Sequence, residues 1–189
     1  RQPRIDIQTT LADDLLNIKG SIVHLSKLML NLVTNAAEAT PAGGTITLAT
    51  QNSYLDVDML AYEKIPAGEY VLLTIADQGV GIPPEYQKRI FEPFFSKTKM
   101  GRSGSGLGMT VVWGTVKDHG GYVGLDSREG HGTRFTIYLP ATREEKPAAP
   151  QRVVLEDYVG HEKILIVDDS RGQREIAANM LAKLGYQTA

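Results

Sequence analysis

The most regular pattern in the chain lies between residues 21 and 39, where apolar side chains recur every three or four positions. This spacing aligns them along one side of an α-helix, and it predicts an amphipathic helix over Ser21–Ala39. Pro41 and the pair Gly43–Gly44 are expected to end it. The apolar side comprises Ile22, Leu25, Met29, Leu32, Val33 and Ala36. The polar side comprises His24, Lys27, Asn31, Asn35 and Glu38.

Several shorter segments alternate apolar and polar residues, which is typical of half-buried β-strands. They are residues 5–7, 45–51, 71–77 and 133–139. Residues 53–67 have no such alternation, and we expect an irregular insertion there. A further strand is predicted just before Gly130 and Gly132, which would form the turn of a hairpin.

A second helical region follows a stretch that is rich in glycine, lysine and serine. Pro83–Pro84 is expected to open a short helical turn that ends near Ile90. Residues 91–105 have no periodicity, so a mobile loop is predicted. The next helix is expected from about Gly106 to His119, because a glycine pair follows it.

The amino-acid composition of the chain changes after residue 140. Prolines, alanines and mixed charges over residues 141–160 indicate a linker. Residues 163–170 then read KILIVDDS, an apolar run that ends in two aspartates. This pattern is typical of a buried parallel strand with carboxylates at its end, and residues after it predict one more helix.

Composition narrows the functional classes. With 42% hydrophobic and 22% charged residues, the chain has the composition of a soluble globular protein. Its net charge of −2 does not favour nucleic acid as a partner, and the absence of cysteine excludes disulfide and thiolate chemistry. Neither a membrane-spanning apolar run nor a signal peptide is evident. We therefore expect a cytoplasmic piece of a longer protein that makes no membrane contact itself.

Two groups of residues could hold a nucleotide and its metal ion: a pair of asparagines and one aspartate. Asn31 and Asn35 are four residues apart, so both amides can converge on one oxygen-rich ligand such as hydrated Mg²⁺. The alternative is a solvated helix face. Asp77 ends an apolar strand before two glycines, where a carboxylate can accept a hydrogen bond from an exocyclic amine. The alternative is an ordinary turn aspartate.

The glycine-rich loop could bind phosphates. Cations beside exposed backbone N–H groups at a helix start attract anions, although a plain surface loop is the alternative. The residues are Lys97, Lys99, Arg102, Gly104, Gly106 and Gly108. No Walker sequence is present, and no strand directly precedes these glycines as a Rossmann site requires. Gly132–Thr133 adds only weak evidence, because a threonine at a strand start is common.

The order and spacing of these segments resemble the catalytic ATP-binding domain of sensor histidine kinases, within the superfamily that also contains the gyrase B subunit and the MutL ATPase. Five segments carry the resemblance over roughly residues 5–140. They look like the N box (28–39, LMLNLVTNAAEA), the first glycine box (77–82, DQGVGI), the F box (91–98, FEPFFSKT), the second glycine box (104–109, GSGLGM) and the terminal Gly-Thr element (132–133, with Phe135). The F box separates kinases from gyrase and MutL.

The resemblance implies the fold and the cofactors, ATP and Mg²⁺. The expected fold is an α/β two-layer sandwich over residues 1–140, with a mixed sheet covered by helices on one face, as in Bergerat-type ATP-binding domains. Asn35 would ligate Mg²⁺ and Asn31 would assist at the phosphates. Asp77 would bind the adenine amino group, and Thr133 would reach the adenine edge through water. The adenine pocket would be shaped by Gly79, Gly81 and Ile82.

The loop residues also receive implied roles. The phosphates would be contacted by Gly104, Gly106 and Gly108, which would also hinge the loop as a lid, and Leu107 would belong to the same cofactor-binding site. Positive charge would come from Lys97, Lys99 and Arg102. Phe91 and Phe94 would anchor the lid on the domain.

Residues 161–189 resemble the start of a response-regulator receiver domain, with Asp168 and Asp169 as part of its Mg²⁺ site. The parent would then be a hybrid histidine kinase. Its γ-phosphoryl group would pass to a histidine on a separate dimerisation domain, and from there to a receiver aspartate. His24, His119, His131 and His161 all lack the context of that phosphoacceptor, and the general base is also expected outside the chain.

Three further expectations remain open at this point. A nucleotide-sensing module without kinase activity and a serine kinase of the anti-sigma-factor type are the alternative functions. Because the receiver-like segment lacks neighbouring strands, it is expected to pack on the kinase domain or to pair with a second copy of the chain.

Overall fold

The computed structural model describes residues 5–95, 106–144 and 160–189. The chain divides into two compact units, residues 1–145 and 146–189. The predicted lid residues Lys97, Lys99, Arg102 and Gly104 lie outside the described residues, as does most of the predicted linker.

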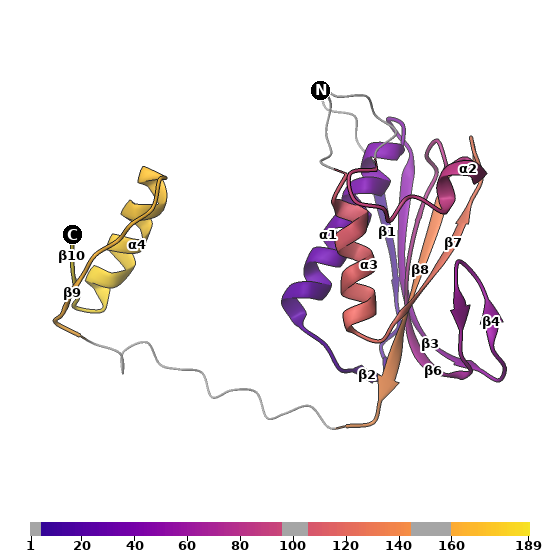
Figure 1. The fold of residues 1–189 in the computed structure, drawn as a ribbon, viewed down its shortest axis with the longest axis horizontal. Coiled ribbons are helices and arrows are strands. Elements are labelled where there is room, and N and C mark those ends of the chain that lie inside the picture. The colour runs from indigo at the N-terminus through magenta and orange to yellow at the C-terminus, as the bar shows by residue number, and fades with distance from the viewer. Residues whose placement is uncertain (1–4, 96–105, 145–159) are drawn as a thin grey trace. The chain divides into compact units, whose positions relative to one another are not determined.

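The first unit is built on a mixed sheet whose strands follow the order β1-β3-β6-β8-β2, with β7 also paired to β8 (Figure 1). Only β1 and β3 run parallel, and the other pairs are antiparallel. The strands are β1 (Asp6–Leu11), β2 (Asn17–Ile18), β3 (Thr45–Leu55), β6 (Gly68–Asp77), β7 (Tyr122–Ser127) and β8 (Thr133–Thr142). The predicted two-layer α/β fold is therefore confirmed, and β3 and β8 are longer than the sequence indicated.

Helices α1 (Ile22–Ala39) and α3 (Gly108–Asp118) cover the same face of this sheet (Figure 1). Leu28 and Leu32 of α1 are almost fully buried, as are Val112 and Val116 of α3. They pack against side chains on one face of the sheet, including Ile75 at its centre. Of the predicted apolar side of α1, Leu32 and Ala36 are buried, whereas Ile22 is 84% exposed and the buried Leu28 was not predicted. The buried stripe still repeats every four residues, which made the helical period visible in the sequence.

The end of α3 is joined to the start of α1 by His119. The His119 Nδ1 atom is 2.6 Å from the Thr115 carbonyl oxygen, which can only accept, so Nδ1 carries the proton. The Nε2 atom is then free to accept the Ser21 backbone N–H at 3.0 Å. Ser21 caps α1 in turn, because its hydroxyl accepts the His24 N–H. One imidazole thus links the two helix ends.

The expected irregular insertion is instead an ordered hairpin, which corrects the sequence prediction. Strand β3 continues to Leu55, and β4 (Met59–Leu60) then pairs with β5 (Lys64–Ile65). Ile65 is fully buried against Tyr70 and Leu72 of β6. The hairpin therefore has its own small hydrophobic cluster, which two-residue strands cannot reveal by alternation.

Short helix α2 (Pro84–Gln87) follows the glycine loop and begins with proline, as predicted. Helix α3 begins at Gly108, two residues later than expected. The glycines near residue 130 do form the turn between β7 and β8, because both Gly130 and Gly132 have positive φ angles.

Over the described residues 160–189, the second unit contains a strand, a helix and a strand. Strand β9 (Lys163–Ile164) is followed by α4 (Arg171–Lys183) and by β10 (Gln187–Thr188), which pairs parallel to β9. The sequence predicted a strand up to residue 170 and none after Tyr186, so β9 is shorter than expected and β10 was missed. Leu165 and Val167 are 73% and 84% exposed, and Ile176 and Met180 of α4 are also exposed.

Candidate functional site

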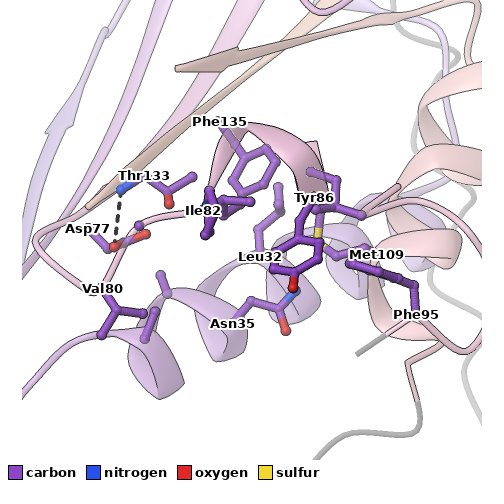
Figure 2. Close-up of a pocket in the computed structure, with 15 residues that line it drawn as sticks. Leu32, Asn35, Asp77, Val80, Ile82, Tyr86, Phe95, Met109, Thr133 and Phe135 are labelled. Carbon is purple, nitrogen blue, oxygen red and sulfur yellow. Dashed lines mark hydrogen bonds between the residues drawn. The ribbon is translucent and has the colours of Figure 1, made fainter. Parts of the chain in front are cut away.

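A cleft of about 260 Å³ opens between α1, the end of β6 and the segments around α2 and α3 (Figure 2). Its wall is largely apolar, with one carboxylate, one amide and two hydroxyl groups. The lining residues are Leu32, Asn35, Ala36, Ala39, Asp77, Val80, Gly81, Ile82, Pro83, Tyr86, Ile90, Phe95, Met109, Thr133 and Phe135. A flat apolar ligand with a polar edge fits this chemistry.

Asp77 and Thr133 lie together at one end of the cleft (Figure 2). They are partners in the β6–β8 ladder, and the Asp77 Oδ1 atom accepts the Thr133 backbone N–H at 3.2 Å. The same oxygen accepts the Gly79 N–H at 2.8 Å. Burial raises the pKa of the Asp77 carboxyl above its ordinary value, and these two hydrogen bonds offset only part of that effect. Two backbone donors therefore fix the carboxylate from one side.

The loop after Asp77 is packed too closely for side chains at its glycines. A Cβ on Gly79 would lie 2.4 Å from the Ala39 carbonyl oxygen at the end of α1. A Cβ on Gly81 would lie 2.0 Å from the Arg128 carbonyl oxygen, and Gly81 also has φ +67°. The glycines thus let the loop dock between α1 and the β7–β8 turn. Gly81 and Ile82 line the cleft, whereas Gly79 is buried beside it.

The two candidate asparagines of α1 have different positions. Asn35 lines the cleft, and its amide faces the space between Asp77 and Phe95 (Figure 2). Asn31 is one turn earlier and is not among the lining residues. Its Nδ2 atom donates to the Lys27 carbonyl oxygen at 3.0 Å, and its Oδ1 atom is next to Gly108. Asn31 therefore lies beside the start of α3.

The far end of the cleft is formed by largely apolar side chains to which the sequence analysis gave no role of their own. Phe95, Tyr86 and Met109 lie there (Figure 2), and the rings of Tyr86 and Phe95 are 5.7 Å apart. The prediction that Phe94 anchors this region is wrong, because its side chain is 76% exposed and its φ is +63°. That backbone angle turns Phe94 outward and leaves Phe95 to line the cleft. Phe95 lies within the F box (91–98), and that membership was the signal in the sequence that could have pointed to it.

Phe91, the other predicted anchor, is buried as expected. Its ring lies 5.0 Å from Trp113 and 5.1 Å from Tyr62 of the β4–β5 hairpin. The described residues before the predicted lid are therefore held at Phe91 by an aromatic cluster that includes both α3 and the insertion.

The described residues after the predicted lid lead directly into α3. The Gly106 carbonyl oxygen accepts the Phe94 N–H at 3.1 Å, so the backbone at these two residues is joined. Gly106 has φ +68°, and a Cβ there would lie 2.7 Å from Phe94 backbone atoms. Leu107 follows at the N-cap and Gly108 begins the helix, with no side-chain cap. The first N–H groups of α3 therefore lack a side-chain acceptor from the N-cap.

The two tail aspartates lie in the second unit. The Asp168 Oδ1 atom accepts the Ser170 N–H at 2.7 Å, and the Asp168 carbonyl oxygen accepts a hydrogen bond from Arg174. Asp169 is exposed. In the described part of the chain, no group of three or more potential metal-binding side chains is present. No described helix is long and apolar enough to cross a membrane.

Comparison with known proteins agrees with this geometry. Residues 20–143 match the family described as "Histidine kinase-, DNA gyrase B-, and HSP90-like ATPase". Sensor kinase CckA of Brucella abortus is 36% identical over 96% of this chain, which covers 20% of that relative. Sensor histidine kinase ZraS of Salmonella typhi is 34% identical over 75% of this chain and 27% of its own length. The chain thus spans only about a fifth to a quarter of these relatives.

Two solved structures are also similar. A mycobacterial sensor histidine kinase, MprB, matches 72% of this chain and 82% of its own chain, with a TM-score of 0.57 and 30% identity. Full-length ShkA in complex with AMPPNP matches 99% of this chain and 35% of its own chain, with a TM-score of 0.59 and 26% identity.

The chain therefore belongs to the histidine kinase, gyrase B and HSP90-like ATPase family. Within that family its relatives identify it as the ATP-binding catalytic domain of a two-component sensor histidine kinase.

Proposed function

We propose that the cleft binds Mg²⁺–ATP and that the domain transfers the γ-phosphoryl group to a histidine on a separate dimerisation domain of the same parent protein. The observation that carries this proposal is the Asp77–Thr133 pair at the end of an apolar cleft. A carboxylate there accepts a hydrogen bond from the 6-amino group of adenine, while the apolar wall contacts the ring.

Asn35 is the residue proposed to ligate Mg²⁺. Its amide oxygen is a hard ligand of the type that Mg²⁺ prefers, and it lines the cleft away from Asp77. Mg²⁺ supplies charge neutralisation at the phosphates during transfer. Asn31 lies beside Gly108, so both amides border the path from the base pocket to the start of α3.

The phosphates are proposed to lie at Gly106, Leu107 and Gly108. The first backbone N–H groups of α3 and the helix dipole favour an anion there. Lys97, Lys99, Arg102 and Gly104 are proposed to complete this site from the segment outside the described residues. Catalysis by this domain is then mainly positioning of the phosphoryl group, with the acceptor histidine brought from outside.

Residues 161–189 are proposed to be the start of a receiver domain, which would make the parent a hybrid kinase. The parallel β9–α4–β10 arrangement supports this, as do the matches to CckA and ShkA that extend over nearly the whole chain. Asp168 and Asp169 would belong to the receiver's Mg²⁺ site. Pairing of two copies through this segment and a cytoplasmic location of the domain both stay predictions.

The test is phosphotransfer to a histidine hairpin domain taken from a sensor kinase and supplied separately. The full chain with Mg²⁺ and γ-labelled ATP should give an acid-labile, base-stable phosphohistidine on the hairpin. Asp77→Asn should lower the initial rate at subsaturating ATP. Binding without any transfer would favour the nucleotide-sensing module, and acid-stable phosphoserine on an added protein would favour the serine kinase.

A further inference from the structure

Ser127 is the last residue of β7. It lies behind the end of the cleft that holds Asp77 and Thr133, and it is not among the lining residues. Its Oγ atom has three short contacts. It accepts the Ile82 backbone N–H at 2.8 Å, lies 3.1 Å from the Gly132 carbonyl oxygen, and lies 2.8 Å from the Thr133 Oγ1 atom. A serine hydroxyl has one proton and two lone pairs, so these contacts use its full hydrogen-bonding capacity.

The partners determine where each proton lies. The Ile82 N–H can only donate, so it takes one lone pair of Ser127. The Gly132 carbonyl can only accept, so it takes the Ser127 proton. The second lone pair then accepts the Thr133 hydroxyl proton, which leaves Thr133 Oγ1 with lone pairs alone toward the cleft. Thr133 is only 6% exposed, so its hydroxyl has little access to water elsewhere.

We infer that Ser127 is a specificity-determining positioning residue, which acts through Thr133 to make the polar end of the cleft an acceptor-only surface. This inference rests on the proposed binding of ATP in the cleft. Asp77 and Thr133 both then present lone pairs to the base. The inference concerns the group at position 6 of the purine. There an adenine amino group donates to the Asp77 and Thr133 lone pairs, whereas the carbonyl oxygen of hypoxanthine or guanine would face those lone pairs and is disfavoured.

The environment of Ser127 supports a fixed orientation. Gln87 of α2 donates through Nε2 to both the Ile82 and the Ser127 carbonyl oxygens, each at 2.9 Å. The Gly130 N–H also donates to the Val80 carbonyl oxygen at 2.8 Å. The glycine loop and the β7–β8 turn are therefore joined on both sides of Ser127, which limits rotation of its hydroxyl away from these partners.

The inference is tested with ATP and ITP, which share the ribose triphosphate and differ at the 6 position of the base. The dissociation constants of both Mg²⁺ complexes are measured by calorimetry on the full chain, and their ratio is compared between variants. Wild type should prefer ATP by roughly ten- to hundredfold. Ser127→Ala frees the Thr133 proton to donate to a 6-carbonyl oxygen, so the ratio should fall by about three- to tenfold. Ser127→Thr retains a hydroxyl and should restore most of the preference.

A double-mutant cycle separates this role from general loop support. In a Thr133→Val background, Ser127→Ala should leave the ATP/ITP ratio unchanged, because no hydroxyl remains to reorient. The ratio is measured on one protein sample, so a reduced active fraction cancels. Equal weakening of both nucleotides by Ser127→Ala would overturn the inference, as would an equal fall of the ratio in both backgrounds. If wild type bound neither nucleotide, the proposed function itself would fail.

Discussion

Glu63 and Lys117 are 54 residues apart in the chain, yet the Glu63 Oε1 atom lies 2.6 Å from the Lys117 Nζ atom. Glu63 comes from the β4–β5 hairpin and Lys117 from the last turn of α3. Oε1 also accepts the Val123 N–H at 2.9 Å, and Lys117 lies 4.4 Å from the Trp113 ring centroid. The insertion is thereby joined to the helix that begins at the phosphate end of the proposed site.

Neutralising Glu63 should therefore destabilise the domain. The two side chains are only 22% and 32% exposed, so Glu63→Gln leaves Lys117 partly desolvated without its counter-charge. We expect the unfolding free energy to fall by about 1–2 kcal/mol in urea denaturation. Glu69→Gln is the matched control, since its Arg143 partner is 77% exposed and the loss of unfolding free energy should be clearly smaller. Equal losses of unfolding free energy in the two variants would show that partial burial does not strengthen the Glu63–Lys117 ion pair.

The proposed base contact predicts a specific defect in Asp77→Asn. Losing a charge-assisted hydrogen bond to the 6-amino group should raise the Kd for Mg²⁺–ATP by roughly ten- to hundredfold in calorimetry. Asp126→Asn removes an exposed carboxylate from the neighbouring β7 and should leave the Kd unchanged. Unchanged affinity in Asp77→Asn would contradict the assignment of the adenine edge.

The same substitution should stabilise the nucleotide-free protein at neutral pH. Burial raises the pKa of Asp77, so its ionised form is disfavoured by folding. Below its ordinary value of 3.8 the carboxyl is protonated in the folded and unfolded states, and the penalty vanishes. The stability advantage of Asp77→Asn, on the order of 1 kcal/mol or less, should thus be full at pH 7. This stability advantage should shrink as the pH falls through the raised pKa of Asp77. An advantage that grows toward acid pH would contradict a raised pKa.

Asn35→Ala should remove most of the Mg²⁺ dependence of ATP binding. Its amide oxygen is the proposed protein ligand, and alanine leaves no donor at that position of α1. Titrations with ATP in Mg²⁺ and in EDTA measure the dependence directly. Thr34→Ala, on an exposed side of the same helix turn, should retain the wild-type response. If Asn35→Ala also retained it, another group would have to hold the metal.

Two glycines of the same region should respond in opposite directions to alanine. Gly106→Ala places a Cβ at φ +68° and 2.7 Å from Phe94 backbone atoms, so we expect a loss of about 1–3 kcal/mol and weaker ATP binding. Gly114 lies within α3 with no atom within 4 Å of an added Cβ. Gly114→Ala should therefore stabilise the domain by about 0.5–1 kcal/mol. Thermal and urea unfolding distinguish the two results.

Sequence patterns predicted the parts of the fold that have strong local signals. Helix α1 was predicted closely, because eighteen residues repeat one period and Ser21 caps them. The β4–β5 hairpin was missed, because its strands have two residues each and depend on distant partners such as Lys117. Its order comes from tertiary contacts that leave no local period.

The same distinction applies to the candidate site: residues within sequence motifs were predicted, and residues positioned by distant contacts were not. The family motifs drew attention to Asp77 and Asn35, and the structure brings both to one cleft. Phe94 and Phe95 could not be distinguished, since only a backbone angle decides which ring turns inward. Ser127 had no signal at all, because its contact with Ile82 spans 45 residues and gives no spacing to recognise.

The imidazole of His119 gives the two long helices a common mechanical element. Both of its nitrogen atoms form hydrogen bonds. Nδ1 donates to the Thr115 carbonyl oxygen of α3, and Nε2 accepts the backbone N–H of Ser21, the N-cap of α1. Helix α3 begins at the proposed phosphate site, and α1 carries Asn35. A movement that separates the two helix ends has to break one of these hydrogen bonds, so the ring couples the helix that carries Asn35 to the helix that begins at the proposed phosphate site.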